Sequence, residues 1–218
     1  MLLVDKPLGW TSFDVVRKLR VLVRTGKIGH AGTLDPLATG LLILCTGKFT
    51  KRINDYMAQE KEYTGTITLG ASTPTYDLES EPVAVRDPSF VTPAILGEVI
   101  AAQFTGEIMQ IPPAHSAIKV GGRRVYELAR KGVEVKLEAR RVTIKEFAVT
   151  RFELPVVEFR VVCTTGTYIR SLANDLGAVL GCGGYLSALR RTRIGEYTVE
   201  QAMNMEAAQK YIENIFLG

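Results

Sequence analysis

The sequence is poor in the residues that build metal centres and disulfide frameworks. It has 2 histidines and 3 cysteines in 218 residues, and Cys45, Cys163 and Cys182 stand far apart. This spacing matches neither a disulfide-linked secreted domain nor the paired cysteines of a zinc site. The simplest interpretation is a cytosolic protein that holds no metal.

Long hydrophobic runs are also missing. No apolar run reaches the length that a membrane-spanning helix needs. The N-terminus, MLLVDKPLGW, has no basic lead and no small-residue cleavage site, so we expect no signal peptide. A composition of 46% hydrophobic and 23% charged residues is typical of a globular chain with one large domain or two small ones.

Charge is distributed unevenly along the chain. Residues 1–60 carry nine Lys and Arg against five Asp and Glu, residues 61–110 carry two against seven, and residues 111–141 carry eight against three. Two basic zones on either side of an acidic zone favour a polyanionic partner that contacts selected faces. A solvated basic helix is an equally good explanation of the charge taken alone.

Strand and helix signals alternate without a regular βαβ rhythm, which favours a mixed α/β sheet over a doubly wound one. GLLILCTG, residues 40–47, is a continuous apolar run of strand length and predicts a buried central strand. Residues 11–26 predict a helix with Phe13, Val16, Leu19 and Leu22 on one face. Further helices are expected over residues 92–106, 167–181 and 199–215.

The first candidate functional residue is an aspartate directly before a proline, in the glycine-rich stretch GHAGTLDPLATGLL. Pro36 keeps Asp35 out of helical geometry, and the glycines let another molecule approach the backbone closely. A turn with a solvated carboxylate is the common alternative. No second carboxylate follows for a Mg²⁺-dependent phosphoaspartate, and no Ser or Cys is well placed for a triad with His30.

Two further residues stand out by position. Arg170 falls in the first turn of the helix predicted over 167–181, where the macrodipole disfavours a cation. A nearby carboxylate would stabilise it there, and a surface arginine that bends into solvent is the alternative. Tyr63 shares a strand face with Ile67 and Leu69, so it is either a core residue or an aromatic platform at the edge of a cleft.

Taken together, six segments resemble, in this order, the bacterial TruB-type tRNA pseudouridine synthases: LLVDKPLGWTSFDVV, GHAGTLDPLATGLL, KEYTGTITLG, PPAHSAIKVGGRRVYELARKG, GTYIRSLANDLG and LRRTRIG. The resemblance covers essentially the whole chain, and GTLDPLATG is a specific signature. It implies that the protein isomerises uridine to pseudouridine at position 55, in the T-loop of tRNA, without a cofactor or a metal. It also implies a cytoplasmic monomer that binds the T-arm of tRNA and requires no protein partner and no membrane.

The resemblance implies three catalytic residues. Asp35 matches the catalytic aspartate, Arg170 matches the arginine that pairs with it, and Tyr63 matches the tyrosine that stacks on the target base. An aspartate could attack the nucleotide or take a proton from its ribose, and the sequence leaves both roles open. The arginine would keep the aspartate ionised and oriented.

The resemblance also implies substrate-binding residues. Tyr168 matches a second active-site aromatic, Leu189 a residue that lines the uracil pocket, and His30 the histidine that enters the T-loop where the base has left. Lys119, in the basic segment 114–140, is expected to bind the RNA. The family usually has a tyrosine at the position of His115, so the role of that residue stays open.

The implied fold is α/β (mixed α+β), with a central mixed, mainly antiparallel sheet flanked by helices. We expect one catalytic domain over residues 1–218, in which residues 114–140 form a thumb-like segment, and no C-terminal PUA domain. Two other functions stay open. One is a guide-RNA-dependent pseudouridine synthase, and the other is a catalytically idle protein that binds or folds tRNA.

Overall fold

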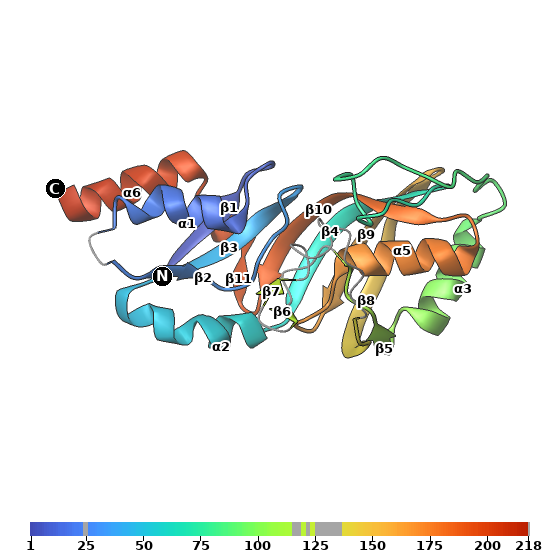
Figure 1. The fold of residues 1–218 in the computed structure, drawn as a ribbon, viewed down its shortest axis with the longest axis horizontal. Helices are drawn as coiled ribbons and strands as arrows, with labels where there is room; N and C mark the ends of the chain where they lie inside the picture. The colour runs from blue at the N-terminus through green and yellow to red at the C-terminus, as the bar shows by residue number, and fades with distance from the viewer. Residues whose placement is uncertain (24–25, 115–118, 121–122, 125–136, 218) are drawn as a thin grey trace. The chain divides into compact units, whose positions relative to one another are not determined.

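The computed structural model describes residues 1–23, 26–114, 119–120, 123–124 and 137–217 (Figure 1). The chain divides into two compact units. The first unit comprises Met1–Thr64 and Ala188–Gly218, and the second comprises Gly65–Ser187. Strands β4 (Lys61–Leu69) and β10 (Gly184–Ile194) pass from one unit into the other.

The first unit is built around strand β3 (Ala38–Thr46). On one side β3 pairs antiparallel with β1 (Leu2–Lys6), and it also pairs antiparallel with β2 (Ile28–His30). It pairs in parallel with β10, which pairs antiparallel with β11 (Tyr197–Thr198). Parallel and antiparallel pairs therefore occur together, and the predicted mixed sheet is confirmed.

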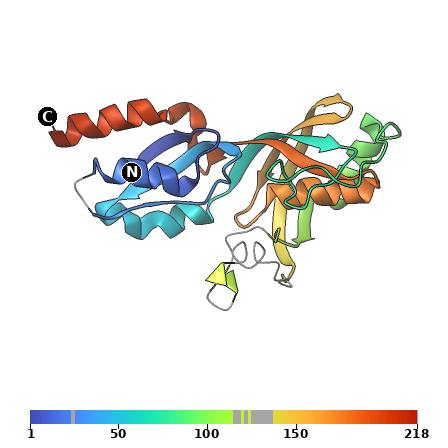
Figure 2. The same ribbon diagram turned by 45° about the horizontal axis from the view of Figure 1, so that its top comes forward.

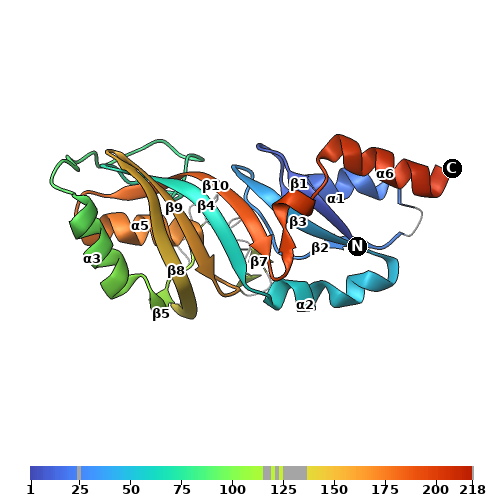
Figure 3. The same cartoon turned by 180° about the vertical axis from the view of Figure 1, so that it is seen from behind.

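Alternate side chains of β3 enter two separate cores. Leu42 and Leu44 pack with helices α1 (Ser12–Arg20) and α6 (Met205–Leu217). Leu41, Ile43 and Cys45 pack with Tyr56 of helix α2 (Ile53–Ala58), which follows the 3-10 helix η1 (Gly47–Arg52). Figures 2 and 3 show α1 and α6 on one face of this sheet and α2 on the other. Burial on both faces explains the continuous apolar run and confirms the predicted central strand.

Helix α1 begins where the sequence predicts. Thr11 is its N-cap and forms a reciprocal capping box with Asp14. The buried face carries Val15, Val16 and Leu19, whereas Phe13 is 59% exposed. The expectation that Phe13 lies on the buried face is therefore wrong, because the face that packs on β3 is centred on Leu19 and turns Phe13 outward.

The second unit contains strands in the order β10, β4, β9 (Val156–Cys163), β8 (Arg140–Glu153) and β5 (Gly106–Gln110). The pairs β5–β8 and β8–β9 are antiparallel. Among its described residues, the helices are α3 (Pro93–Gln103) and α5 (Ile169–Leu180). Helix α5 approaches β10 closely, because a Cβ added to Gly177 would lie 2.0 Å from the backbone nitrogen of Gly184. Glycine is required there by packing.

Helix ends differ from the predictions at several places. Helix α1 ends at Arg20, six residues before the predicted end at Gly26. The final predicted helix over 199–215 is a 3-10 turn, η2 (Val199–Gln201), followed by α6 from Met205. A new helix starts because the side chain of Asn204 accepts a hydrogen bond from the backbone of Ala207 (2.8 Å) and caps α6. Helix α3 ends at Gln103, three residues before the predicted end at Gly106, which begins β5.

Most of the predicted thumb-like segment 114–140 lies outside the described residues. Within it, β6 (Lys119–Val120) pairs antiparallel with β7 (Arg123–Arg124), with Lys119 opposite Arg124. His115 and residues 121–122 and 125–136 belong to the part outside the description. Among the described helices, none combines the length and the apolar character that crossing a membrane requires.

Candidate active site

Asp35 lies on the loop between β2 and β3, and its neighbours hold that loop in place. Asp35 is half-buried, and its carbonyl oxygen accepts a hydrogen bond from the backbone of Ala38 (3.0 Å). The buried hydroxyl of Ser12 accepts from the backbone N–H of Leu34 (2.8 Å) and donates to the carbonyl of Leu34 (3.2 Å). The first residue of α1 therefore fixes the backbone immediately before Asp35.

Lys6 supports the other side of the loop from inside the protein. Its ammonium group donates to the carbonyl oxygens of Pro7 (3.0 Å), Trp10 and Pro36 (3.4 Å). Burial lowers the pKa of Lys6 to about 8, while the carboxylate of Asp35 opposes this shift. The lysine is thus close enough to Asp35 for their charges to attract.

Arg191 connects the loop to β10. This buried side chain donates from Nε to the carbonyl of Leu41 (2.8 Å) and from Nη2 to the carbonyl of Gly32 (3.1 Å). Gly40, opposite Arg191 in the parallel β3–β10 pair, has a φ of +103°. A Cβ at Gly40 would lie 2.3 Å from the Arg191 carbonyl oxygen, so only glycine fits.

Two predicted substrate-binding residues lie in the first unit, on the sheet that carries the loop of Asp35. Leu189 on β10 is half-buried and pairs with Ala38, three residues after Asp35. His30 ends β2, opposite Leu44 of β3. Burial lowers the pKa of His30 below its usual 6.5, and the positive charge of Arg191 lowers it further. The imidazole is therefore neutral at pH 7.

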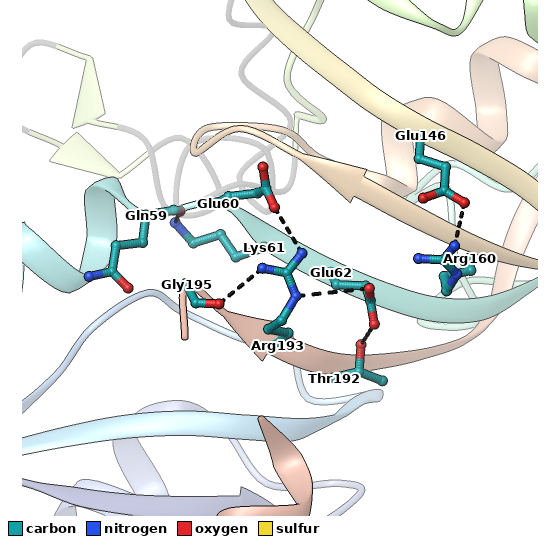
Figure 4. A network of polar contacts seen from close by, with 9 residues as sticks. All are labelled: Gln59, Glu60, Lys61, Glu62, Glu146, Arg160, Thr192, Arg193 and Gly195. Carbon is teal, nitrogen blue, oxygen red and sulfur yellow. Dashed lines mark hydrogen bonds and ion pairs between the residues drawn. The ribbon is translucent and has the colours of Figure 1, made fainter. Parts of the chain in front are cut away.

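Tyr63 is a buried residue of β4, and two glutamates that precede it are held by β10. Arg193 of β10 donates to Glu60 (2.8 Å) and forms a second ion pair with Glu62 (3.9 Å). Thr192 donates to Glu62 (2.8 Å). Figure 4 shows the Arg193 side chain between the two glutamates. This network fixes the start of β4, and with it the backbone position of Tyr63.

Arg170 lies in the second unit, in the first turn of α5, and is 4% exposed. Its Nη1 donates to the carbonyl of Thr75 (3.2 Å), and its Nε lies 3.7 Å from Oδ2 of Asp77. Helix electrostatics predicts a carboxylate beside Arg170, and Asp77 is a carboxylate in that position. The pairing of Arg170 with Asp35 would join residues of different units and stays a prediction.

Sequence reasoning missed Asp77, which lies in the stretch TPTYDLESEP and reads as part of an acidic loop. The local signal is an Asx turn, because Oδ1 of Asp77 accepts from the backbone of Glu79 (3.0 Å). Asp77 also forms an isolated parallel bridge with Leu186, more than a hundred positions along the chain. No local pattern reveals that contact.

Tyr168, immediately before α5, is held by the buried side chain of Gln110. The amide of Gln110 donates to the Tyr168 carbonyl (3.0 Å) and accepts from the Tyr168 backbone N–H (2.7 Å). Ser171 donates to the carbonyl of Ile111 (2.8 Å). The end of β5 thus positions the first turn of α5. In the part of the chain that the structure describes, no three His, Cys, Asp or Glu side chains are grouped to hold a metal ion.

The chain is similar to named proteins over almost its whole length. A relative from Flavobacterium johnsoniae, named tRNA pseudouridine synthase B, is 50% identical and covers 98% of this chain and 96% of its own. A relative of the same name from Parabacteroides distasonis is 49% identical, and the match covers 98% of this chain and 93% of the relative.

Solved structures give the same fold. The Cbf5–Nop10–Gar1 complex contains a chain that superposes with a TM-score of 0.74 at 30% identity, over 97% of this chain and 54% of the other. A chain of an H/ACA ribonucleoprotein bound to a substrate RNA containing 2′-deoxyuridine superposes with a TM-score of 0.71 at 28% identity. The match covers 97% of this chain and 53% of the other. This chain therefore spans about half the length of those proteins.

Two family models together cover most of the sequence. Residues 20–169 match the N-terminal domain of the TruB family of pseudouridylate synthases, and residues 170–214 match the C-terminal domain of tRNA pseudouridylate synthase B. Together with the relatives that are 49–50% identical over 98% of the chain, these matches show that the chain belongs to the TruB family of pseudouridylate synthases.

Proposed function

We propose that this protein isomerises uridine to pseudouridine at position 55, in the T-loop of tRNA, as a stand-alone enzyme without a cofactor or a metal. The observation that carries the proposal is the 50% identity, over 98% of the chain, to a protein named tRNA pseudouridine synthase B. The loop of Asp35 supports it, because hydrogen bonds from Ser12, Lys6 and Arg191 hold that loop where a reacting carboxylate would need to be fixed.

The reaction is an isomerisation, so its atoms and electrons balance within the substrate. The bond from ribose C1′ to N1 of uracil breaks, and a bond from C1′ to C5 forms. A proton leaves C5 and a proton is gained at N1. Asp35 supplies the anionic oxygen, either as a nucleophile toward the nucleotide or as a base toward its ribose. Flipping the base out of the folded RNA costs roughly a few kcal/mol.

Binding groups offset that cost. Stacking on an aromatic side chain is worth about 1–3 kcal/mol per base, and Tyr63 is the proposed platform. Arg170 keeps Asp35 ionised, and Tyr168 is a second aromatic residue of the active site. Leu189 lines the uracil pocket, and neutral His30 enters the T-loop. Lys119 and the rest of segment 114–140 contact the phosphates. Residues 1–218 act as one catalytic domain of a cytoplasmic monomer that needs no protein partner.

Tritium release tests the proposal. Purified protein is incubated with a tRNA transcript that carries tritium at C5 of uridine, and the released label is counted. We expect release without a guide RNA, and none from a transcript in which uridine 55 is replaced by cytidine. Asp35→Asn should abolish release. Asp55→Asn is the matched control, because Asp55 is an exposed aspartate of the same unit whose ion pair with Arg52 lies at the surface, and it should leave release unchanged.

The same assay separates the two other functions. Release only in the presence of a guide RNA would support a guide-RNA-dependent pseudouridine synthase. The structural similarity to a chain of the Cbf5–Nop10–Gar1 complex is the reason to test for it. Tight binding of tRNA without any release would support an idle binding or folding protein. Either result would overturn the proposal.

A further inference from the structure

A cavity of about 480 Å³ follows the outer side of helix α1, and the functional site does not use it. Six residues line it: Gly9, Trp10, Asp14, Arg17, Lys18 and Val21. The buried side of α1, which carries Val15, Val16 and Leu19, faces the core instead. The cavity therefore opens on the exposed face of the helix, entirely within the first unit.

One wall of this α1 cavity is aromatic and firmly supported. Trp10 is half-buried and packs against the core formed by β3, α1 and α6. It is the one tryptophan of the sequence. A ring held by the core on one side and facing a cavity on the other is a ready stacking surface, because little side-chain entropy is lost when a second ring packs on it.

The remaining walls carry a net positive charge. Arg17 and Lys18 are exposed cations, and Asp14 is the single anion of the lining. The Asp14 carboxylate is already occupied, because it accepts from the backbone and the hydroxyl of Thr11 (3.0 and 2.6 Å) and from Arg17 (2.9 Å). Lys18 is not part of that ion pair, and Arg17 remains largely exposed within it. An aromatic wall beside exposed cations fits a nucleobase with its phosphate better than an apolar peptide.

The rim of the α1 cavity touches the loop of Asp35. The backbone N–H of Gly9 donates to the carbonyl of Pro36 (2.9 Å), the residue directly after Asp35. The carbonyl of Trp10 accepts from the same Lys6 ammonium that reaches Pro36. The α1 cavity and the loop of Asp35 are therefore direct neighbours in the fold.

We infer that the α1 cavity binds an unpaired nucleotide that neighbours the target uridine in the RNA, with its base on Trp10 and its phosphate at Arg17 and Lys18. This inference rests on the proposed function, because it takes RNA as the substrate. It assigns helix α1 a part in RNA binding.

Intrinsic fluorescence tests the inference without any substitution. Because Trp10 is the one tryptophan, its emission reports on the α1 cavity alone. Wild-type protein is titrated with a T-arm stem-loop RNA, and binding is followed independently by the anisotropy of fluorescein-labelled RNA. We expect tryptophan emission to be quenched with the same midpoint as the anisotropy change. Saturation by anisotropy without quenching would overturn the inference, and no binding at all would overturn it together with the proposed function.

Variants supply a second test in the tritium-release assay. Trp10→Ala should raise KM roughly 5- to 150-fold while kcat at saturating RNA is kept, since stacking is lost but the chemistry is not. Trp10→Phe should restore most of the affinity. Phe49→Ala is the matched control, because Phe49 is an exposed aromatic residue of the same unit outside the cavity, and it should leave KM unchanged.

Charge removal completes the design. The double variant with Arg17→Gln and Lys18→Gln should weaken RNA binding and reduce the slope of log affinity against log salt by about 0.7 for each phosphate that is no longer neutralised.

An unchanged KM in Trp10→Ala, with wild-type stability in a thermal melt, would refute the stacking role. Quenching that rises with protein concentration in the absence of RNA, with dimers in sedimentation, would assign the cavity to a second copy and overturn the inference. Normal tritium release in either case would leave the proposed function standing.

Discussion

Asp77 is expected to stabilise the protein through Arg170, and a conservative substitution measures how strongly. The two side chains are each 5% exposed, with Nε of Arg170 3.7 Å from Oδ2 of Asp77. Asp77→Asn keeps the shape of the side chain and an oxygen that accepts from the backbone of Glu79. It removes one charge and little else.

The magnitude follows from the burial of the pair. Two unit charges about 4 Å apart attract by about 4 kcal/mol at an effective dielectric constant near 20. Removing one partner of a buried pair costs about 3–5 kcal/mol, because the desolvation of the other charge is no longer offset. We take about 3 kcal/mol, since Arg170 keeps its hydrogen bond to the carbonyl of Thr75 (3.2 Å). For a chain of this size the melting temperature should fall by roughly 6–12 °C.

A double variant separates stability from catalysis. Arg170→Met alone should also destabilise the protein, because it strands the Asp77 carboxylate. Combining Arg170→Met with Asp77→Asn removes both charges, so stability should return to within about 1–2 kcal/mol of wild type. Tritium release should stay absent, since Arg170 itself is gone. Urea unfolding and thermal melts measure the cycle. A loss below about 1 kcal/mol in Asp77→Asn, or a double variant no more stable than the single ones, would refute this reasoning.

Three further perturbations test the loop of Asp35. Asp35→Asn should lower tritium release by about 10²–10⁴-fold or more, while filter binding of tRNA stays close to wild type, because the anionic oxygen is lost but the loop shape is not. The pKa of Lys6 is about 8 in the folded protein, against 10.5 for a lysine in water. Between pH 8 and 10.5 the folded protein therefore binds fewer protons at Lys6 than the unfolded chain does, so the free energy of unfolding should rise with pH. Relative to Lys6→Met, wild type should gain at most about 1.4 kcal/mol per pH unit in this range. Parallel pH profiles of the two proteins in urea unfolding would contradict this. Gly40→Ala should cost at least about 2 kcal/mol, because its Cβ would meet the Arg191 carbonyl at 2.3 Å, whereas Gly97→Ala, in an open position of α3, should be neutral or stabilising in the same melts.

Sequence patterns over a few neighbouring residues predict the secondary structure of this fold well. The apolar run of β3 predicts a strand buried on both faces, and two cores lie on its two faces. The end of helix α5 at Gly181, which has a φ of +82°, also follows from neighbouring residues. Phe13 shows where such patterns fail, because helical spacing alone does not say which of two adjacent apolar stripes will face the sheet.

The contacts that hold the candidate site residues in place could not be predicted from such patterns. The family signature names Asp35 and Arg170, which bear charges that a reaction could use, but it says nothing of what holds them. Ser12 and Lys6 do so through backbone groups of distant segments, such as the carbonyl of Leu34 and that of Pro36, whereas Asp77 does so through its own carboxylate.

Partners of this kind leave no local pattern, since a carbonyl oxygen is present at every residue and any loop can supply one. Lys6 makes the point most clearly. In the sequence it ends a short strand before a proline, where a solvated lysine is expected. In the fold it is fully buried, and its ammonium is satisfied by three carbonyl groups, one of them beside Asp35. A buried lysine is stable only while all of those loops keep their places. Lys6 therefore ties the shape of the Asp35 loop to the first strand of the chain, and variants of Lys6 should change catalysis without any contact between Lys6 and the RNA.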